Sequence, residues 1–170
     1  MRIVLVGMPG SGKTTLGKQA ARALGLSFRD SDAYIIKICK MRISKIFEYV
    51  GESGFRKIEQ ISLHKILRQD NIILSTGGGM PCFNENMQYI NKKTISIFLN
   101  PGEDELFRRL QYSGQNRPLI KNLTGSELKE YINKTMTERG HYYSKAQFEY
   151  DFKKDFVKFL NEDILPNIDI

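Results

Sequence analysis

A glycine-rich turn near the N-terminus has the residue types and spacing needed to hold phosphate groups. Gly7-Met8-Pro9-Gly10-Ser11-Gly12-Lys13-Thr14 fits the Walker A pattern over its whole length. Its glycines let main-chain amides curl around phosphate oxygens, and the helix expected after it adds a favourable dipole for anions. Lys13 would reach the β- and γ-phosphates, and the Thr14 hydroxyl would bind Mg²⁺. The loop predicts nucleotide binding, but GTPases, motor ATPases and small-molecule kinases all carry it.

Two acidic residues supply a second part of this chemistry. Asp30 and Asp32 lie two positions apart, at the end of a short predicted strand. A kinase needs a carboxylate that takes a proton from the acceptor hydroxyl, and it needs acids close to magnesium. A helix cap formed by Asp30 or Ser31 is the competing interpretation. Because the phosphate loop precedes them, we favour the catalytic interpretation.

The elements that must position these residues alternate along the chain. Short apolar runs predict strands at Ile3–Val6, Leu26–Arg29, Ile72–Leu74, Thr94–Leu99 and Phe148–Phe152. Helices are predicted at Lys13–Leu24, Ala33–Lys40, Ile43–Val50, Phe55–Gln69, Glu103–Gln111 and Ser126–Arg139, with a terminal helix to about Leu160. This alternation is typical of an α/β fold, in which helices cover both faces of a parallel sheet. Ligands then bind at the carboxyl ends of the strands.

Composition, charge and cysteine spacing restrict the class of protein and its partners. The chain has 170 residues, 41% of them hydrophobic and 26% charged, which favours one globular domain. The net charge of +7 is scattered without a basic run, so we expect no nucleic-acid partner. Two cysteines and two histidines are too widely spaced for a zinc site, and the apolar N-terminal run is too short for a signal peptide or a membrane span. We therefore expect a cytoplasmic protein with reduced thiols and no membrane association.

Several motifs, taken in order, resemble those of the shikimate kinase family over roughly residues 3–139. They are the phosphate loop, Asp30-Ser31-Asp32, Gly51-Glu52-Ser53-Gly54-Phe55-Arg56-Lys57-Ile58-Glu59, Ser75-Thr76-Gly77-Gly78-Gly79 and Arg117-Pro118-Leu119. The resemblance implies a P-loop NTPase three-layer fold around a five-stranded parallel sheet, in a single kinase domain of residues 1–170 with a lid at about 112–122. It implies a monomer that uses ATP and Mg²⁺ to phosphorylate the 3-hydroxyl of shikimate, a step of chorismate and aromatic amino acid biosynthesis.

The resemblance also implies roles for individual residues. Asp32 would bind the acceptor hydroxyl and act as the base, and Lys13 and Arg117 would be the other catalytic residues. ATP would be bound by Gly10, Ser11, Gly12, Lys13, Thr14, Thr15, Arg109 and Arg117, with Arg109 stacked on adenine. Shikimate would be bound by Asp32, Arg56, Gly77, Gly78, Gly79 and Arg139. Arg56 and Arg139 would hold its carboxylate, and Phe47 and Phe55 would form the walls of the acceptor pocket. Magnesium would lie near Thr14 and Asp30.

Each later motif, taken alone, has an ordinary structural explanation. Arg56 lies three residues before Glu59 and could form a plain helical surface pair, and the glycine triplet could be a simple loop. Gly140-His141-Tyr142 replaces the residues usual in the family, and no family motif can be placed beyond Tyr150. The alternatives are a kinase for another polyol acid such as gluconate, a nucleotide kinase, and a P-loop switch without acceptor chemistry.

Overall fold

Five parallel strands form one central sheet with the strand order β2-β3-β1-β4-β5. The computed structural model describes residues 1–113, 120 and 123–168. The strands are β1 (Arg2–Val6), β2 (Ser27–Asp30), β3 (Ile72–Ser75), β4 (Ile95–Leu99) and β5 (Phe148–Tyr150). The predicted α/β class with a five-stranded parallel sheet is confirmed.

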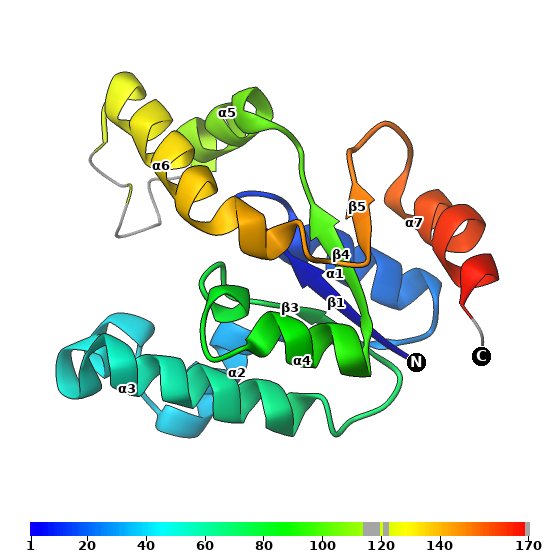
Figure 1. Cartoon of the computed structure of the whole chain (residues 1–170), viewed down its shortest axis with the longest axis horizontal. Coiled ribbons are helices and arrows are strands. Elements are labelled where there is room, and N and C mark those ends of the chain that lie inside the picture. The colour runs from blue at the N-terminus through cyan, green and yellow to red at the C-terminus, as the bar shows by residue number, and fades with distance from the viewer. Residues whose placement is uncertain (114–119, 121–122, 169–170) are drawn as a thin grey trace.

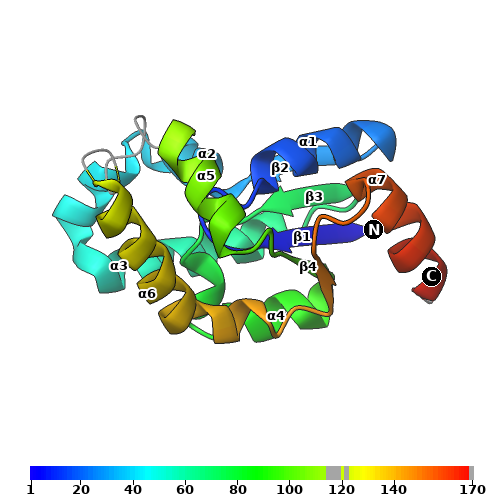
Figure 2. The same ribbon diagram turned by 90° about the horizontal axis from the view of Figure 1, so that it is seen from above.

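Helices cover both faces of this sheet, which gives three layers (Figures 1 and 2). They are α1 (Lys13–Ala23), α2 (Ser31–Cys39), α3 (Ile43–Ile66), the short 3-10 helix η1 (Met80–Cys82), α4 (Asn86–Lys93), α5 (Glu103–Ser113), α6 (Gly125–Tyr143) and α7 (Phe156–Phe159). A π-helical turn, Leu160–Ile164, and a 3-10 turn, Leu165–Asn167, continue α7. None of the helices within the described ranges is both long and apolar enough to cross a membrane.

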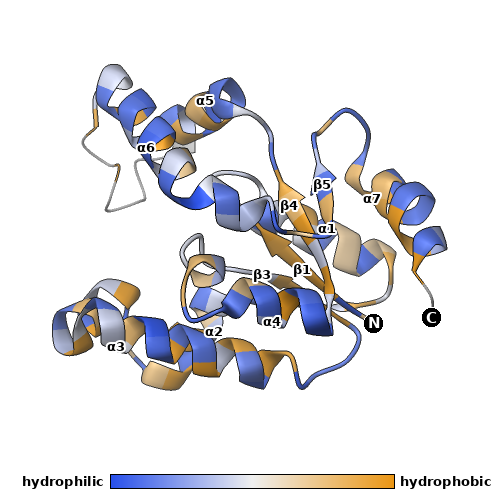
Figure 3. Ribbon diagram, viewed as in Figure 1, coloured by the Kyte–Doolittle hydropathy of each residue, from blue (hydrophilic) through white to orange (hydrophobic). Residues whose placement is uncertain are grey.

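The central strand β1 shows how the sequence produces two cores. Ile3 and Leu5 pack with α1 and α7, whereas Val4 and Val6 pack with α2, α3, α4, α5 and α6 on the opposite face. Successive side chains of a strand point to opposite faces, so a continuous apolar run is what a strand covered on both sides requires. Figure 3 shows these apolar strands in the centre of the molecule and hydrophilic residues on the outer helix faces.

Helix α3 contains the break that the sequence predicts. The two predicted helices, Ile43–Val50 and Phe55–Gln69, correspond to the two parts of α3 (Ile43–Ile66), which are joined across a kink. Its backbone leaves helical geometry only at Gly51, where φ is 66° and ψ is −178°. Glycine adopts this conformation without the steric cost of a Cβ, so the chain bends there and resumes the helix at once.

Other elements also differ from the prediction, in their presence or in their bounds. Helix α4 was not predicted, because it buries only Asn86, Met87 and Ile90 and therefore lacks a strong apolar period. Helix α2 begins at Ser31, two residues earlier than expected, because the Asp30 carboxylate caps it. Strand β5 ends at Tyr150, and Phe152 lies beyond it with a positive φ of 65°.

Candidate active site

The phosphate loop joins β1 to α1 at the carboxyl end of the sheet. The Lys13 ammonium donates 2.8 Å hydrogen bonds to the carbonyl oxygens of Gly7 and Met8, so its side chain folds back along the loop. The residue before α1, Gly12, has a φ of 99° and makes no side-chain capping hydrogen bond to the main-chain amides at the start of the helix. These amides, the helix dipole and Lys13 together favour bound phosphate.

Asp30 caps a helix, which is one of the two roles that the sequence left as alternatives, and its other oxygen faces the phosphate loop. Its Oδ1 accepts hydrogen bonds from the main-chain N–H groups of Asp32 and Ala33, at 3.0 and 3.1 Å, and so caps α2. Its Oδ2 accepts a 3.1 Å hydrogen bond from the Thr14 hydroxyl. The capping bonds fix the carboxylate so that its second oxygen faces the phosphate loop.

Hydroxyl and carboxylate oxygens lie close together beside the phosphate loop. This set of oxygens can be compared with the ligands that Mg²⁺ prefers. Thr14 Oγ1 also lies 3.4 Å from Ser75 Oγ at the end of β3, so three oxygen-bearing side chains meet. Mg²⁺ prefers oxygen ligands and is commonly held by one or two side chains together with substrate phosphates. Among the described residues, no cluster of three or more His, Cys, Asp and Glu could hold a metal alone. The donors therefore fit a nucleotide-bound Mg²⁺ rather than an all-protein cage.

Asp32 lies in the first turn of α2, directly against the glycine triplet. A Cβ built on Gly77 would come within 2.6 Å of Asp32 Oδ1, which no real side chain tolerates. The Gly77 amide donates a 2.7 Å hydrogen bond to the Ser31 hydroxyl, which ties the triplet to the start of α2. A side chain at position 77 would therefore displace this carboxylate.

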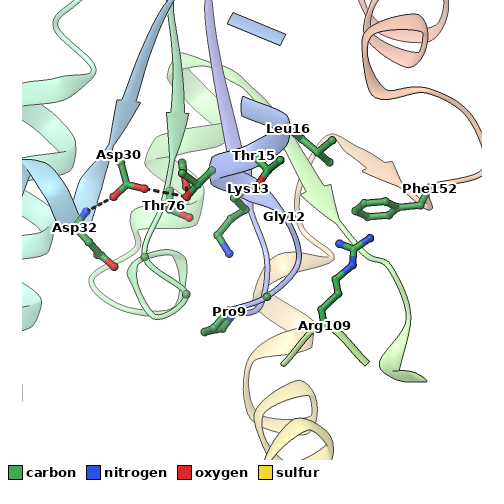
Figure 4. Close-up of a pocket in the computed structure, with 15 residues that line it drawn as sticks. Pro9, Gly12, Lys13, Thr15, Leu16, Asp30, Asp32, Thr76, Arg109 and Phe152 are labelled. Carbon is green, nitrogen blue, oxygen red and sulfur yellow. Dashed lines mark hydrogen bonds between the residues drawn. The ribbon is translucent and has the colours of Figure 1, made fainter. Parts of the chain in front are cut away.

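These groups border one cavity of about 700 Å³ (Figure 4). Asp30 and Asp32 lie on one side of Lys13, and Arg109 and Phe152 lie on the other. The lining residues are Pro9, Gly10, Gly12, Lys13, Thr14, Thr15, Leu16, Asp30, Asp32, Ser75, Thr76, Gly77, Gly78, Arg109 and Phe152. The cavity is large enough for a nucleotide and a small acceptor placed end to end.

Arg109 reaches the cavity from α5. Its Nη1 donates a 3.1 Å hydrogen bond to the Ser11 carbonyl oxygen and its Nε a 2.7 Å hydrogen bond to Glu105. The guanidinium also lies 4.6 Å from the centre of the Phe152 ring. Hydrogen bonds from Arg108 and Arg109 lower the pKa of Glu105 to about 2, so this carboxylate stays ionised. Sequence reasoning missed Phe152 as a site residue, and its only signal was an aromatic residue at the end of the last predicted strand.

Arg56 lies beyond this cavity, beside the last glycine of the triplet. A Cβ on Gly79 would come within 2.6 Å of Arg56 Nη1, and the guanidinium stacks 4.0 Å from the centre of the Phe83 ring. Arg56 also donates a 2.6 Å hydrogen bond to Glu59, whose side chain is 3% exposed. Burial raises the pKa of Glu59, although Arg56 acts in the opposite direction. The pair is therefore a buried one and differs from the plain surface pair considered above.

The two predicted aromatic walls belong to the same region but do not border the cavity. The rings of Phe47 and Phe55 lie 4.2 Å apart, and each lies within 6 Å of the Arg56 guanidinium, at 5.8 and 5.6 Å. Phe55 is buried, whereas Phe47 is only partly covered. Both rings therefore lie beside the Arg56 guanidinium, and all three residues belong to α3.

Arg139 lies near the end of α6, one turn before Tyr143. It acts electrostatically on Glu59, Cys82 and Tyr143, which places it on the Arg56 side of the triplet. The Tyr143 hydroxyl donates a 2.6 Å hydrogen bond to the Gly78 carbonyl oxygen. Burial raises the pKa of Tyr143, and it raises that of the Cys82 thiol to about 11, so both groups stay protonated at neutral pH. Tyr143 thus joins α6 to the glycine triplet.

One predicted catalytic residue cannot be placed. Arg117 and most of the predicted lid at about 112–122 lie outside the described residues. The described part of the site brings together Lys13, Thr14, Asp30 and Asp32 on one cavity, with Arg56 and Arg139 grouped beyond the triplet.

The fold and this arrangement define the class of protein. A phosphate loop, a threonine hydroxyl at the start of the following helix and a carboxylate facing the same cavity are the parts of a small-molecule kinase of the P-loop class. The model of the family described as "Shikimate kinase" matches residues 9–160. The chain belongs to the shikimate kinase family, whose members are P-loop kinases of aromatic amino acid biosynthesis.

Individual relatives agree with this assignment. A shikimate kinase of Parabacteroides distasonis is 39% identical over 90% of this chain and 88% of its own length. The crystal structure of shikimate kinase from Bacteroides thetaiotaomicron has a TM-score of 0.86 at 38% identity, covering 91% of this chain and 89% of that one. Shikimate kinase from Acinetobacter baumannii, solved in complex with shikimate, has a TM-score of 0.81 at 30% identity, covering 96% of this chain and 90% of that one.

Proposed function

We propose that the chain transfers the γ-phosphoryl group of ATP to the 3-hydroxyl of shikimate, giving shikimate 3-phosphate and ADP. The observation that carries the proposal is the position of Asp32. It lines the same cavity as Lys13 and Thr14, and Gly77 leaves it room to face an acceptor. Family membership and the relative that binds shikimate support the choice of acceptor.

The chemical step follows from these positions. Asp32 accepts the proton of the 3-hydroxyl as that oxygen forms a bond to the γ-phosphorus. The bond between the γ-phosphorus and the β–γ bridging oxygen breaks, and its electron pair leaves with ADP. Phosphoryl transfer has a loose transition state, so positioning and neutralisation of charge supply most of the rate enhancement. Lys13 contributes to both, and Arg117 is proposed to do so from the lid.

The nucleotide would lie along the phosphate loop with its base at the opposite end of the cavity. Gly10, Ser11, Gly12, Thr14 and Thr15 would surround the phosphates with main-chain amides and hydroxyls. The base would lie against Arg109 and Phe152, whose stacked surfaces form that end of the cavity. Thr14 and Asp30 would hold the Mg²⁺ ion, which supplies positive charge to the phosphates when it is bound.

The acceptor would lie between Asp32 and the two arginines beyond the glycine triplet, Arg56 and Arg139. A guanidinium donates two parallel hydrogen bonds to a carboxylate, so Arg56 and Arg139 suit the carboxylate of shikimate. Gly77, Gly78 and Gly79 let the main chain approach the ring closely. We further infer that residues 1–170 act as one domain, since the described strands form one sheet, and we keep the monomer that the family resemblance implies.

An acceptor panel tests this function. ADP release would be measured with ATP and Mg²⁺ in the presence of shikimate, gluconate, a nucleoside monophosphate or no acceptor. We expect release to depend on shikimate. Release with another acceptor alone would keep the kinase and reject the substrate, and release independent of every acceptor would favour a nucleotide switch.

A variant tests the assigned base. Asp32→Ala should retain ATP binding and lose about 10²-fold or more of its turnover, because a positioned base contributes that much. A variant with normal turnover would remove Asp32 from this role. Lys13→Ala should weaken nucleotide binding as well as turnover, which separates the two residues.

A further inference from the structure

Two carboxylates of α3 hold the guanidinium of Arg56, and they differ greatly in exposure. Nη1 donates to Glu59 at 2.6 Å and Nη2 donates to Glu52 at 3.0 Å. The side chain of Glu59 is 3% exposed, whereas that of Glu52 is 63% exposed. Positions 52, 56 and 59 lie on one face of a helix, so all three groups share one surface. Glu59 is therefore a fixed partner of Arg56, and Glu52 is one that water can replace.

The rest of the guanidinium leaves little room for a second anion. One face lies 4.0 Å from the centre of the Phe83 ring, and Nη1 is pressed against Gly79. Nε is buried and has no hydrogen-bond partner within the described structure, so a ligand cannot reach it from solvent. Nη2 is then the nitrogen left for a carboxylate that approaches Arg56 from outside, and Glu52 already accepts one of its two N–H groups.

The backbone before Glu52 allows its side chain to move away. Gly51 interrupts the helix with a φ of 66°, so Glu52 is the first residue of the resumed helical segment. A Cβ built on Gly51 meets no atom within 4 Å, so nothing packs over this bend. The Glu52 carboxylate can exchange Arg56 for water without disturbing any packed group.

We propose that Glu52 occupies Nη2 of Arg56 as an internal carboxylate, which the carboxylate of the acceptor displaces on binding. The inference rests on the proposed function, in which Arg56 binds the acceptor carboxylate. Glu52 then lowers the affinity for the acceptor, because each binding event breaks one ion pair. It also favours acceptors that carry an ionised carboxylate, since a neutral group cannot replace a charged one on a guanidinium at equal cost.

The test compares Glu52→Gln with Glu48→Gln. Glu48 lies on the same helix and pairs with Lys45 at 2.6 Å, with its side chain 60% exposed, so its substitution removes the same charge without touching Arg56. Glu52→Gln should lower the KM and the Kd for shikimate about two- to fivefold, the range expected for an exposed ion pair. The kcat and the KM for ATP should stay unchanged, and Glu48→Gln should leave all four constants unchanged. The Kd would come from calorimetry with shikimate alone.

The results that would contradict the proposal for Glu52 can be told apart from one another. A KM and Kd that rise in Glu52→Gln would make Glu52 a positioning residue for Arg56 and overturn the proposal, as would constants equal to those of the unsubstituted chain. An equal decrease in Glu48→Gln would assign the effect to general charge instead. If the unsubstituted chain neither bound nor phosphorylated shikimate, the proposed function would fail first.

Discussion

The carboxylate of Asp32 occupies the space that a side chain at position 77 would need. A Cβ on Gly77 would come within 2.6 Å of Asp32 Oδ1, while the Gly77 amide is bound to the Ser31 hydroxyl at 2.7 Å. The strand-to-helix turn after β3 and the first turn of α2 are therefore fitted to each other. The position of the proposed base depends on the absence of one methyl group.

Gly77→Ala should reduce kcat by about 10²-fold, because the new methyl group displaces the Asp32 carboxylate and a shift of about 1 Å can cost that much. Steady-state turnover with shikimate measures the effect. The matched control is Gly125→Ala at the start of α6, where the nearest atom to a new Cβ is 3.8 Å away. Normal turnover in Gly77→Ala would show that Asp32 need not lie where the structure places it.

Tyr143→Phe should destabilise the fold by about 0.5–1.5 kcal/mol, because it removes the hydrogen bond from the buried Tyr143 side chain to the Gly78 carbonyl oxygen. It should also raise the KM for shikimate, since Tyr143 ties the glycine triplet to the helix that carries Arg139. Denaturant unfolding and kinetics provide the two readouts. Tyr49→Phe is the control, because Tyr49 is 78% exposed. An unchanged free energy of unfolding would show that this hydrogen bond does not stabilise the fold.

Phe152→Ala should raise the KM for ATP about tenfold and leave the KM for shikimate unchanged. The reason is that stacking of a base on an aromatic ring is worth about 1–3 kcal/mol. Phe152 lies at the end of the cavity beside Arg109 and away from Asp32 (Figure 4). Lys153→Ala, at an exposed neighbour, is the control. Equal KM values for ATP in Phe152→Ala and the unsubstituted chain would place the base elsewhere.

Glu59 should make the unfolding free energy depend on pH in a defined direction. Burial raises its pKa in the folded state above the ordinary value of 4.5, so the folded state binds the proton more tightly than the unfolded chain. The contribution of Glu59 to stability is therefore greatest below pH 4.5 and decreases as the pH rises through the folded-state pKa. Subtracting the pH profile of Glu59→Gln from that of the unsubstituted chain isolates this group. A difference that increases with pH would mean that Arg56 outweighs burial.

Much of this architecture could be predicted because the relevant signals are local. Alternating apolar runs and glycine stops predicted all five strands, and the Walker A pattern predicted the loop between β1 and α1. Helix α4 could not be predicted, since it buries too few apolar residues for its period to be visible.

The candidate site was predictable in its loops and acids and less so in its tertiary contacts. Asp30 and Asp32 follow a strand, which is enough to place them at the carboxyl end of a parallel sheet. Ser75 meets Thr14 only because β3 lies beside β1, and Phe152 meets Arg109 only because β5 lies beside β4. Neither contact has a signature in the local sequence.

The central claim is that this chain phosphorylates shikimate at its 3-hydroxyl, and the structure of the product tests it most directly. The purified chain would be incubated with ATP, Mg²⁺ and shikimate, and the product examined by ³¹P NMR with correlation to the ring protons. We predict one phosphate ester whose phosphorus couples to the proton on carbon 3, formed in equal amount to ADP and about 10²-fold or more slowly with Asp32→Ala. Coupling to another ring proton, or ADP without a phosphate ester, would contradict the account.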